Sequence, residues 1–181
     1  MLKSLTVKDL YGLTASEILE ITNQETAVPV DLKKILEKFN ISAVSMDFSE
    51  LESYSEIDRK ILGALICRND NAAIFYNSKD QKDGHRYRFT IAHEIAHCCI
   101  TNECNHIEFR HDPSFLDETE IAANTFAGEL LIPSNSLYDV INKLILPTIE
   151  VLADVFEVSV NVMRERLNCL NIKHNILGYN C

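Results

Sequence analysis

A helix predicted in the middle of the chain combines a broad apolar face with polar groups that cannot be buried alone. Within residues 85–100 the apolar side chains recur at positions i, i+1, i+4, i+5 and i+8, which is typical of a largely buried helix. These side chains are Ile91, Ala92, Ile95, Ala96 and Cys99. The same helix carries His93, Glu94 and His97. Burying two imidazoles and a carboxylate costs several kcal/mol unless each has a partner, so the fold must supply one.

The spacing of these three polar residues indicates a metal site. His93 and His97 are four residues apart, which places both rings on one face of a helix, about one turn apart. Glu94 is rotated by about 100° from His93, so it flanks that face. Zinc peptidases have this H-E-x-x-H arrangement, in which the histidines bind zinc and the glutamate activates water. We therefore predict one zinc ion per chain, bound by His93 and His97, with Glu94 as the catalytic base.

The motif has two other interpretations besides a catalytic zinc site. A pair of core histidines bonded only to protein groups is one, but chance would produce the motif only about 0.02 times in a chain of this composition. The other is a non-catalytic regulatory protein whose metal is structural or vestigial. A fourth protein ligand in the water position, such as His106 or His111, would favour that interpretation.

A catalytic zinc usually has three protein ligands and one open position, so a third ligand must come from elsewhere in the chain. One class of enzyme places a histidine six residues after the second ligand, with a glycine between, but Glu103 and Ile100 occupy those positions here. The remaining candidates are His106, His111, Asp112, Asp117, Glu118 and Glu120.

We favour Glu120 as the third metal ligand because it lies early in a second apolar helix, which ends before Pro133. Small side chains in that helix are expected to permit close approach to the first helix, and they are Ala123, Ala127 and Gly128. Asn124, one turn after Glu120, is predicted to hydrogen-bond a ligand and support it. Glu118 lies about 200° around the helix from Glu120 and would point elsewhere.

The flanking patterns predict an α+β fold, with a small mixed or antiparallel sheet packed on the pair of zinc-site helices and a helical segment following. Residues 1–135 are expected to form a zincin-like metallopeptidase domain with N-terminal helices. Residues 136–181 are expected to form a helical, helix-turn-helix-like segment in the same compact unit. Two apolar stretches flank a turn-rich tetrapeptide and predict a hairpin, at 61–67 and 72–76. The second stretch is either an edge strand that pairs with substrate or an ordinary core strand.

Composition limits the possible partners and the cellular setting. The net charge of −10 gives no general attraction to nucleic acid or anionic lipid. No secretory signal and no membrane-spanning apolar run is visible, and the six cysteines include no CxxC pair, so we expect a cytoplasmic protein. A second metal cluster of Cys99, Cys104, His106 and His111 is disfavoured because its spacing matches no common zinc site.

Three stretches of sequence together resemble the ImmA/IrrE family of bacterial metallopeptidases. They are residues 88–97, the pattern Glu120-x-x-Ala123-Asn124-x-Phe126-Ala127, and residues 130–133. The resemblance is close over residues 86–133 and looser over 29–170. It implies a gluzincin-like site with the ligands and base named above, and a bacterial or phage origin. It also implies a protein substrate, often a helix-turn-helix repressor of a mobile element or stress response.

Two further features of the sequence bear on substrate and partners. Tyr76, His106 and His111 are candidates for stabilising the oxyanion or contacting substrate, and the sequence does not choose among them. Residues 152–159 and the next helix look like a helix-turn-helix. That second helix offers only two cations with a glutamate between them, and residues 141–181 balance four basic against four acidic side chains. Direct nucleic-acid binding is therefore not expected.

Overall fold

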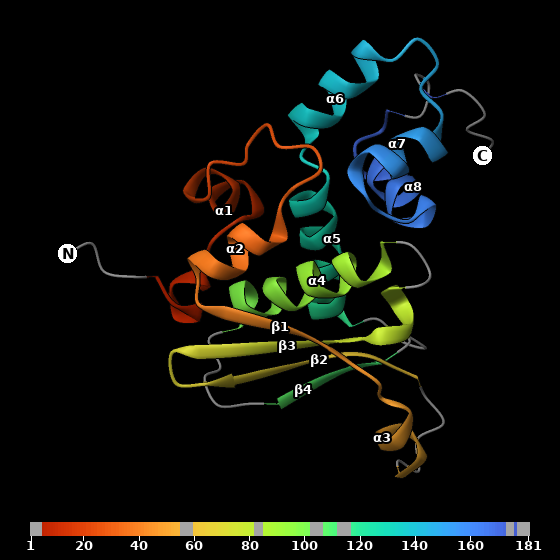
Figure 1. Cartoon of the computed structure of the whole chain (residues 1–181). Coiled ribbons are helices and arrows are strands. Elements are labelled where there is room, and N and C mark those ends of the chain that lie inside the picture. Colours follow the sequence, from red (N-terminus) through yellow and green to blue (C-terminus); the bar gives the residue numbers. More distant parts are fainter. Residues whose placement is uncertain are drawn as a thin grey trace.

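A four-stranded mixed sheet lies beneath a layer of helices in the computed structural model, which describes residues 5–54, 60–81, 85–101, 107–111, 117–172 and 176 (Figure 1). The spatial order is β1-β3-β2-β4, in which β1 runs parallel to β3 and the other neighbours are antiparallel. The strands are β1 (Ile41–Met46), β2 (Ile61–Arg68), β3 (Asn71–Asn77) and β4 (Ile107–His111). The predicted α+β class with a C-terminal helical part is confirmed.

Five of the helices begin at a polar side chain that accepts a hydrogen bond from a backbone N–H of the first turn. These caps are Thr14, Asp31, Asp117, Thr148 and Ser159. The elements are η1 (Val7–Leu10), α1 (Ala15–Ile21), α2 (Leu32–Lys38), α3 (Ser49–Tyr54), η2 (Ser78–Gln81), α4 (Arg86–Ile100), α5 (Glu118–Leu131), α6 (Ser134–Lys143), α7 (Ile149–Phe156) and α8 (Val160–Cys169). None of the described helices is both long and apolar enough to cross a membrane.

The hairpin predicted from the two apolar stretches is confirmed as β2 and β3. Arg68 pairs with Asn71, so Asn69 and Asp70 form the loop, and Asn69 adopts the left-handed conformation that asparagine tolerates (φ 57°). β3 lies between β1 and β2 and therefore has neighbours on both sides. The suggestion that this strand is an open edge for substrate is wrong, and the core-strand alternative is correct.

The sheet ends at β4, which lies in a segment of the sequence with no clear periodic pattern. β4 pairs antiparallel with β2, and the register shifts between Ile61 and Gly63. Its partner β2 lies on one side, so β4 is an outer strand of the sheet, as β1 is at the opposite edge. We did not predict this strand, because five residues within a polar stretch give too short a pattern to stand out.

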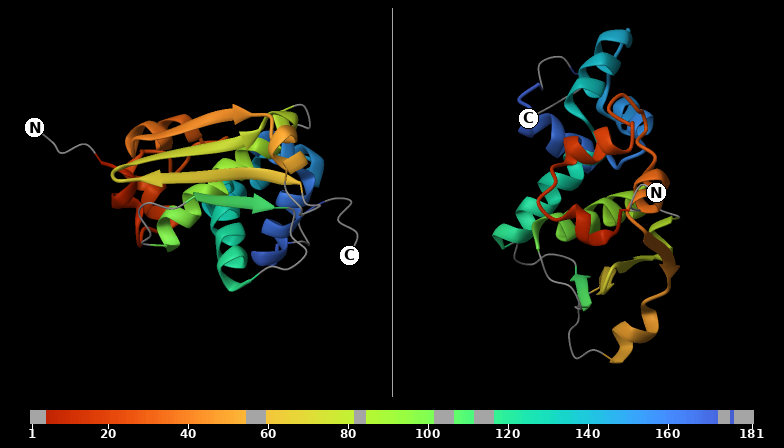
Figure 2. Two further views of the ribbon diagram at one scale, coloured as in Figure 1. Left: turned by 90° about the horizontal axis from the view of Figure 1, so that it is seen from below. Right: turned by 90° about the vertical axis from the view of Figure 1, so that its left-hand side faces the viewer.

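The helices cover one face of the sheet. Seen from below, all four strands lie in front of the helix layer (Figure 2), and α3 lies beyond the sheet on the side away from that layer (Figure 1). α4 packs on β2 and β3 and is covered in turn by α5, so it is buried over most of its length. The central apolar cluster joins the inner face of the sheet to these helices. The helix that carries the predicted metal ligands is thus the central layer of the fold.

Two arginines connect the C-terminal helices to the central helices through hydrogen bonds and ion pairs. Arg88 in α4 donates from Nη2 to the Val30 carbonyl oxygen at 2.6 Å, and its Nη1 lies 3.3 Å from a carboxylate oxygen of Glu157. Arg166 in α8 donates from Nε to the carbonyl oxygen of Ile132 at 3.1 Å and pairs with Glu129 of α5 at 3.2 Å. Both guanidinium groups are almost buried, so these contacts hold α8 and the turn before it against α4 and α5.

Candidate metal centre

The first turn of α5 meets the middle of α4. Asp117 caps α5 by accepting a hydrogen bond from the backbone N–H of Glu120 at 2.9 Å, which fixes where the helix begins. Glu120 consequently stands in the first turn, on the side that faces α4. Ala123 and Ala127 are fully buried, as close helix packing requires. Gly128 differs from our expectation, because a Cβ there would meet nothing within 4 Å and the residue borders a cavity instead.

Three side chains converge where the helices meet. The Nε2 atoms of His93 and His97 lie 2.9 Å apart. Glu120 approaches both rings, with one oxygen 3.4 Å from His93 Nε2 and the other 3.2 Å from His97 Nε2. Both histidines are buried, whereas the Glu120 side chain is 28% exposed. The cluster therefore opens to the outside on the Glu120 side.

The three side chains lie close enough together to share one metal ion. Ligand atoms about 2.0 to 2.2 Å from a tetrahedral zinc lie roughly 3.3 to 3.6 Å from one another. The two Nε2 atoms lie 2.9 Å apart, and each lies 3.2 or 3.4 Å from a different oxygen of Glu120. With one ligand atom taken from each residue, the three atoms lie within 4.8 Å of one another. Two imidazole nitrogens and one carboxylate oxygen also form a common donor set of catalytic zinc sites. His93, His97 and Glu120 could therefore hold one such ion.

Asn124 contacts the metal cluster from α5. Its Oδ1 lies 2.9 Å from Nδ1 of His93. If Nδ1 carries the ring proton, it donates to this oxygen, and the lone pair of His93 then sits on Nε2, which points toward Glu120. The same contact fixes the plane of the ring. Two residues one turn apart on α5 thus contact the cluster: the Glu120 carboxylate approaches the Nε2 atoms, and the Asn124 amide contacts Nδ1 of His93.

Glu94 lies in the interior beside the cluster. Its side chain is 1% exposed, and it stands on the face of α4 that packs over β2. An added Cβ at Gly63 of β2 would lie 3.6 Å from Glu94 Oε1 and 2.6 Å from Thr90 Cγ2. Gly63 was not among the residues predicted for the site. Its signal was a lone glycine inside an apolar strand, which often marks a close backbone approach.

The remaining predicted residues do not join the cluster of ligand atoms among the described side chains. Tyr76 packs its ring against Tyr87, with centroids 5.4 Å apart. His106 lies outside the described residues. His111 ends β4, and its side chain is outside the described set. Their predicted oxyanion and substrate roles therefore stay predictions.

Two thiols of α4, those of Cys98 and Cys99, are buried and uncharged. Burial raises the pKa of the Cys99 thiol to about 12. A hydrogen bond with Cys67, together with burial, raises the pKa of the Cys98 thiol as well. A metal would have to displace these protons before either sulfur could bind it. Of the second cluster that we disfavoured, only Cys99 has a described side chain.

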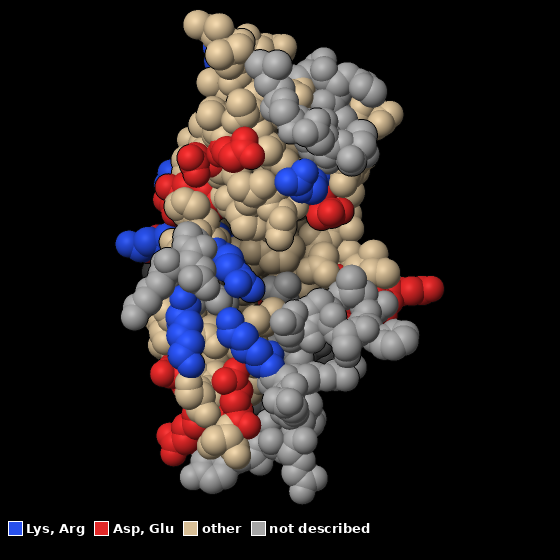
Figure 3. All heavy atoms as spheres, turned by 90° about the vertical axis from the view of Figure 1, so that its right-hand side faces the viewer, with Lys and Arg blue, Asp and Glu red and all other residues tan. Residues whose placement is uncertain are grey.

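The surface is hollowed near the N-terminal end of α4. Seen from the right-hand side of Figure 1, this hollow lies between the upper helices and the sheet, and Lys and Arg side chains stand beside it (Figure 3). A cavity bordered by Arg86, Phe89 and Asn161 opens here, with a volume of about 310 Å³. A second cavity shares Phe89 and Asn161 with it, so the two are neighbours along α4.

A layered α+β fold with two imidazoles and a carboxylate between two central helices defines a protein with a candidate three-residue metal centre. The model of a peptidase family, described as IrrE N-terminal-like domain, matches residues 36–168. This match covers well over half of the chain, so the chain belongs to that family, and the resemblance seen in the sequence is confirmed. Membership supports a metallopeptidase-type function in general. Comparison with curated proteins and with solved structures gave no significant match.

Proposed function

We propose that the chain is a zinc-dependent endopeptidase that binds one zinc ion through His93, His97 and Glu120 and uses Glu94 as its base. The convergence of three ligand atoms within 4.8 Å of one another carries this proposal, in a chain that belongs to a peptidase family. The donor set favours zinc, since imidazole and carboxylate together suit this ion. A metal that polarises the scissile carbonyl and lowers the pKa of water supplies the electrophilic part of the reaction.

The protein side chains supply proton transfer and orientation. Glu94 follows His93 directly in α4, so a carboxylate stands next to a metal ligand without being part of the three-atom cluster. In the proposed reaction Glu94 takes a proton from the attacking water and passes it to the leaving amine. Asn124 holds the ring of His93 at the angle that the ligand atom needs. The partly exposed side of Glu120 leaves room for a peptide to approach.

The position of β4 supports an extended peptide as the substrate. Gly63 of β2 packs beneath Glu94, and the residue opposite Gly63 in β4 is Arg110. β4 therefore lies directly beside the part of β2 that packs beneath Glu94. An extended segment can add to an open sheet edge through backbone hydrogen bonds, with little regard to its side chains. A protein segment in extended form fits this arrangement.

The substrate that we propose is a helix-turn-helix transcriptional repressor of a mobile element or stress response. This choice follows from the resemblance to the ImmA/IrrE family rather than from the geometry of the site. A bacterial or phage origin and a cytoplasmic setting belong to the same proposal. The described cysteines Cys67, Cys98, Cys99 and Cys169 form no disulfide, which suits a reducing compartment.

Two substitutions distinguish the role of the proposed base from that of the proposed metal ligands. Glu94→Gln should keep about one zinc per chain, because Glu94 lies outside the ligand cluster, and should lower the rate of cleavage by about 10² to 10⁴-fold. Glu120→Gln should lower zinc content, because it removes a charged ligand. Glu118→Gln is the matched control, since Glu118 is an exposed acid in the same first turn of α5. Metal content is measured by elemental analysis, and cleavage by mass spectrometry of repressor digests.

The outcomes decide between the enzyme and its non-catalytic alternative. Cleavage by the wild type that disappears in Glu94→Gln supports the peptidase. A zinc-loaded wild type that cuts neither repressors nor a mixed peptide pool would instead indicate a metal-stabilised regulatory protein. Full zinc content in Glu120→Gln would reassign the third ligand.

A further inference from the structure

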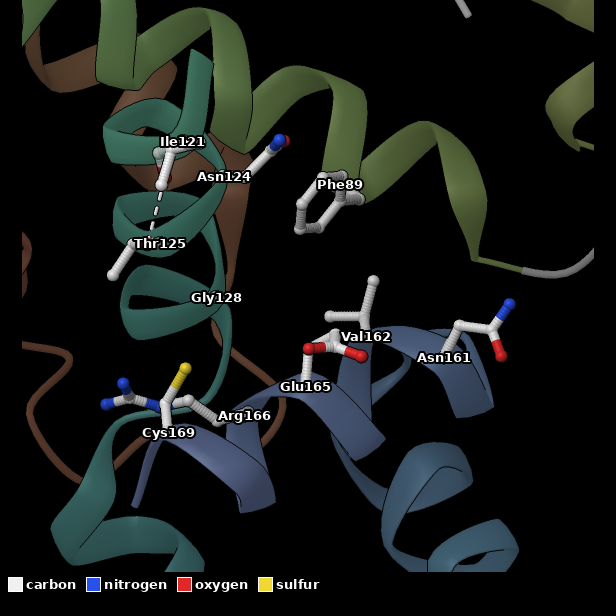
Figure 4. A pocket seen from close by; sticks show the side chains of 10 residues that line it. All are labelled: Phe89, Ile121, Asn124, Thr125, Gly128, Asn161, Val162, Glu165, Arg166 and Cys169. Atoms are coloured by element: carbon white, nitrogen blue, oxygen red, sulfur yellow. Dashed lines mark hydrogen bonds between the residues drawn. The ribbon is translucent and has the colours of Figure 1, made fainter. Parts of the chain in front are cut away.

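A cavity of about 400 Å³ lies beside the metal centre, between α5, α8 and the N-terminal half of α4. Its walls are largely apolar, with Phe89 on one side, Ile121 and Gly128 on α5, and Val162 on α8 (Figure 4). A Cβ at Gly128 would meet nothing within 4 Å, so the glycine widens this space. The cavity is large enough for a long side chain.

The cavity begins next to a candidate metal ligand. Asn124 lines it and also contacts Nδ1 of His93 at 2.9 Å. Phe89 lines it too, and its ring centroid is 6.4 Å from that of His93. Only one layer of side chains therefore separates the cavity from the metal cluster. A peptide held at the metal could place the side chain of a residue beside the cut bond in this space.

One carboxylate, that of the exposed residue Glu165, borders this largely apolar space from α8. Glu165 extends from α8 toward Phe89 (Figure 4), and among the described residues it forms no ion pair. The neighbouring cation, Arg166, is already engaged by Glu129 and the carbonyl oxygen of Ile132. The cavity thus offers apolar walls and one negative charge at its α8 side.

We propose that this cavity is a specificity subsite that accepts a Lys or Arg side chain flanking the cut bond, with Glu165 pairing with its cation. Lys and Arg bury an apolar stem while the charged end seeks a partner, which matches apolar walls with one carboxylate. The net charge of −10 favours a basic segment as well. The inference rests on the proposed peptidase function and adds which residues the site selects.

The proposal also gives α8 a role. Asn161, Val162, Glu165, Arg166 and Cys169 all line the cavity, and their spacing places them on one face of α8. This helix is the second of the helix-turn-helix-like pair. The face that borders the cavity looks toward the metal helices, so its side chains are placed to contact a substrate bound there.

Sequencing the products of a mixed peptide pool tests the subsite. The zinc-loaded wild type should cut with Lys or Arg enriched at one position next to the cut bond. Glu165→Gln should lower this preference about tenfold relative to Leu or Met, since it removes a charge-assisted contact. Glu165→Lys should shift the preference toward Asp and Glu. Glu150→Gln, which replaces an exposed glutamate of α7, should change nothing.

A binding measurement keeps the subsite testable if no peptide is cut. N-acetyl-arginine methylamide is titrated into the Glu94→Gln protein while the Val162 and Phe89 resonances are followed by NMR. Saturable shifts that weaken about tenfold in Glu165→Gln support the subsite, whatever the outcome for catalysis. The proposal is overturned if the arginine probe shifts neither residue, if norleucine methylamide binds as tightly, or if the cleavage preference is unchanged in Glu165→Gln.

Discussion

Replacing Gly63 by alanine would test how closely β2 passes beneath the metal helix. The new Cβ would lie 2.6 Å from Thr90 Cγ2 and 3.0 Å from the carbonyl oxygen of Phe75. Carbon atoms in good contact are about 3.5 to 4.0 Å apart, so the two carbons would overlap by about 1 Å. Overpacking of this kind costs about 1 to 3 kcal/mol, because α4 or β2 must shift. We expect Gly63→Ala to lower the free energy of unfolding by about 2 kcal/mol.

Urea unfolding followed by circular dichroism measures the loss, and thermal melting should show a fall of roughly 4 to 8 °C for a domain of this size. Thr90→Ser removes the Cγ2 methyl and keeps the hydroxyl, so it should restore part of the stability of Gly63→Ala. The double variant should be more stable than the sum of the two single changes by about 1 kcal/mol. Additive effects, or an unchanged unfolding free energy in Gly63→Ala, would show that this contact is not made.

Two other residues give further predictions. Asn124→Ala should weaken zinc binding about 10 to 100-fold in a competition with a chromophoric chelator, because the ring of His93 loses the acceptor that orients it; equal affinity would show that the amide does not support the site. Hydrogen bonds from the backbone N–H of Thr14, and then from its hydroxyl, lower the pKa of Glu17. The stability that this adds is therefore present above the pKa of Glu17 in the unfolded chain and is lost as the pH falls through the folded value. An NMR titration should find Glu17 below the usual value of about 4.3 and find its pKa higher in Thr14→Ala; identical values in both proteins would contradict the assigned cause.

The convergence of His93, His97 and Glu120 was predictable because it depends largely on local rules. A separation of four residues places His93 and His97 on one helical face in any helix, whatever surrounds it. Asp117 caps the next helix through its own side chain, so the start of that helix, and with it the orientation of Glu120 and Asn124, is encoded nearby. Only the packing of α5 against α4 depends on residues far apart in the sequence. The small side chains Ala123 and Ala127 indicated that these two helices pack closely.

The parts that could not be predicted depend on distant contacts. The order of the strands is set by a crossover that places β1 beside β3, and no local pattern distinguishes a central strand from an edge strand of similar composition. β4 pairs with a strand some forty residues earlier in the chain, and its five residues carry little periodic signal. In the sequence Glu165 is only a glutamate between two arginines of a predicted helix. Its place in a cavity near His93 follows only from how α8 docks on α5.

Arg88 limits how far the chain could be shortened. Its guanidinium lies in the interior between the carbonyl oxygen of Val30 and the carboxylate of Glu157, which holds a left-handed backbone conformation (φ 51°) at the end of α7. A truncation that ended after α6 would leave this cation without its counter-ion inside the helix that bears His93. The last two helices are therefore not an attachment that could be removed or exchanged freely: any replacement would have to return a negative charge to the same point.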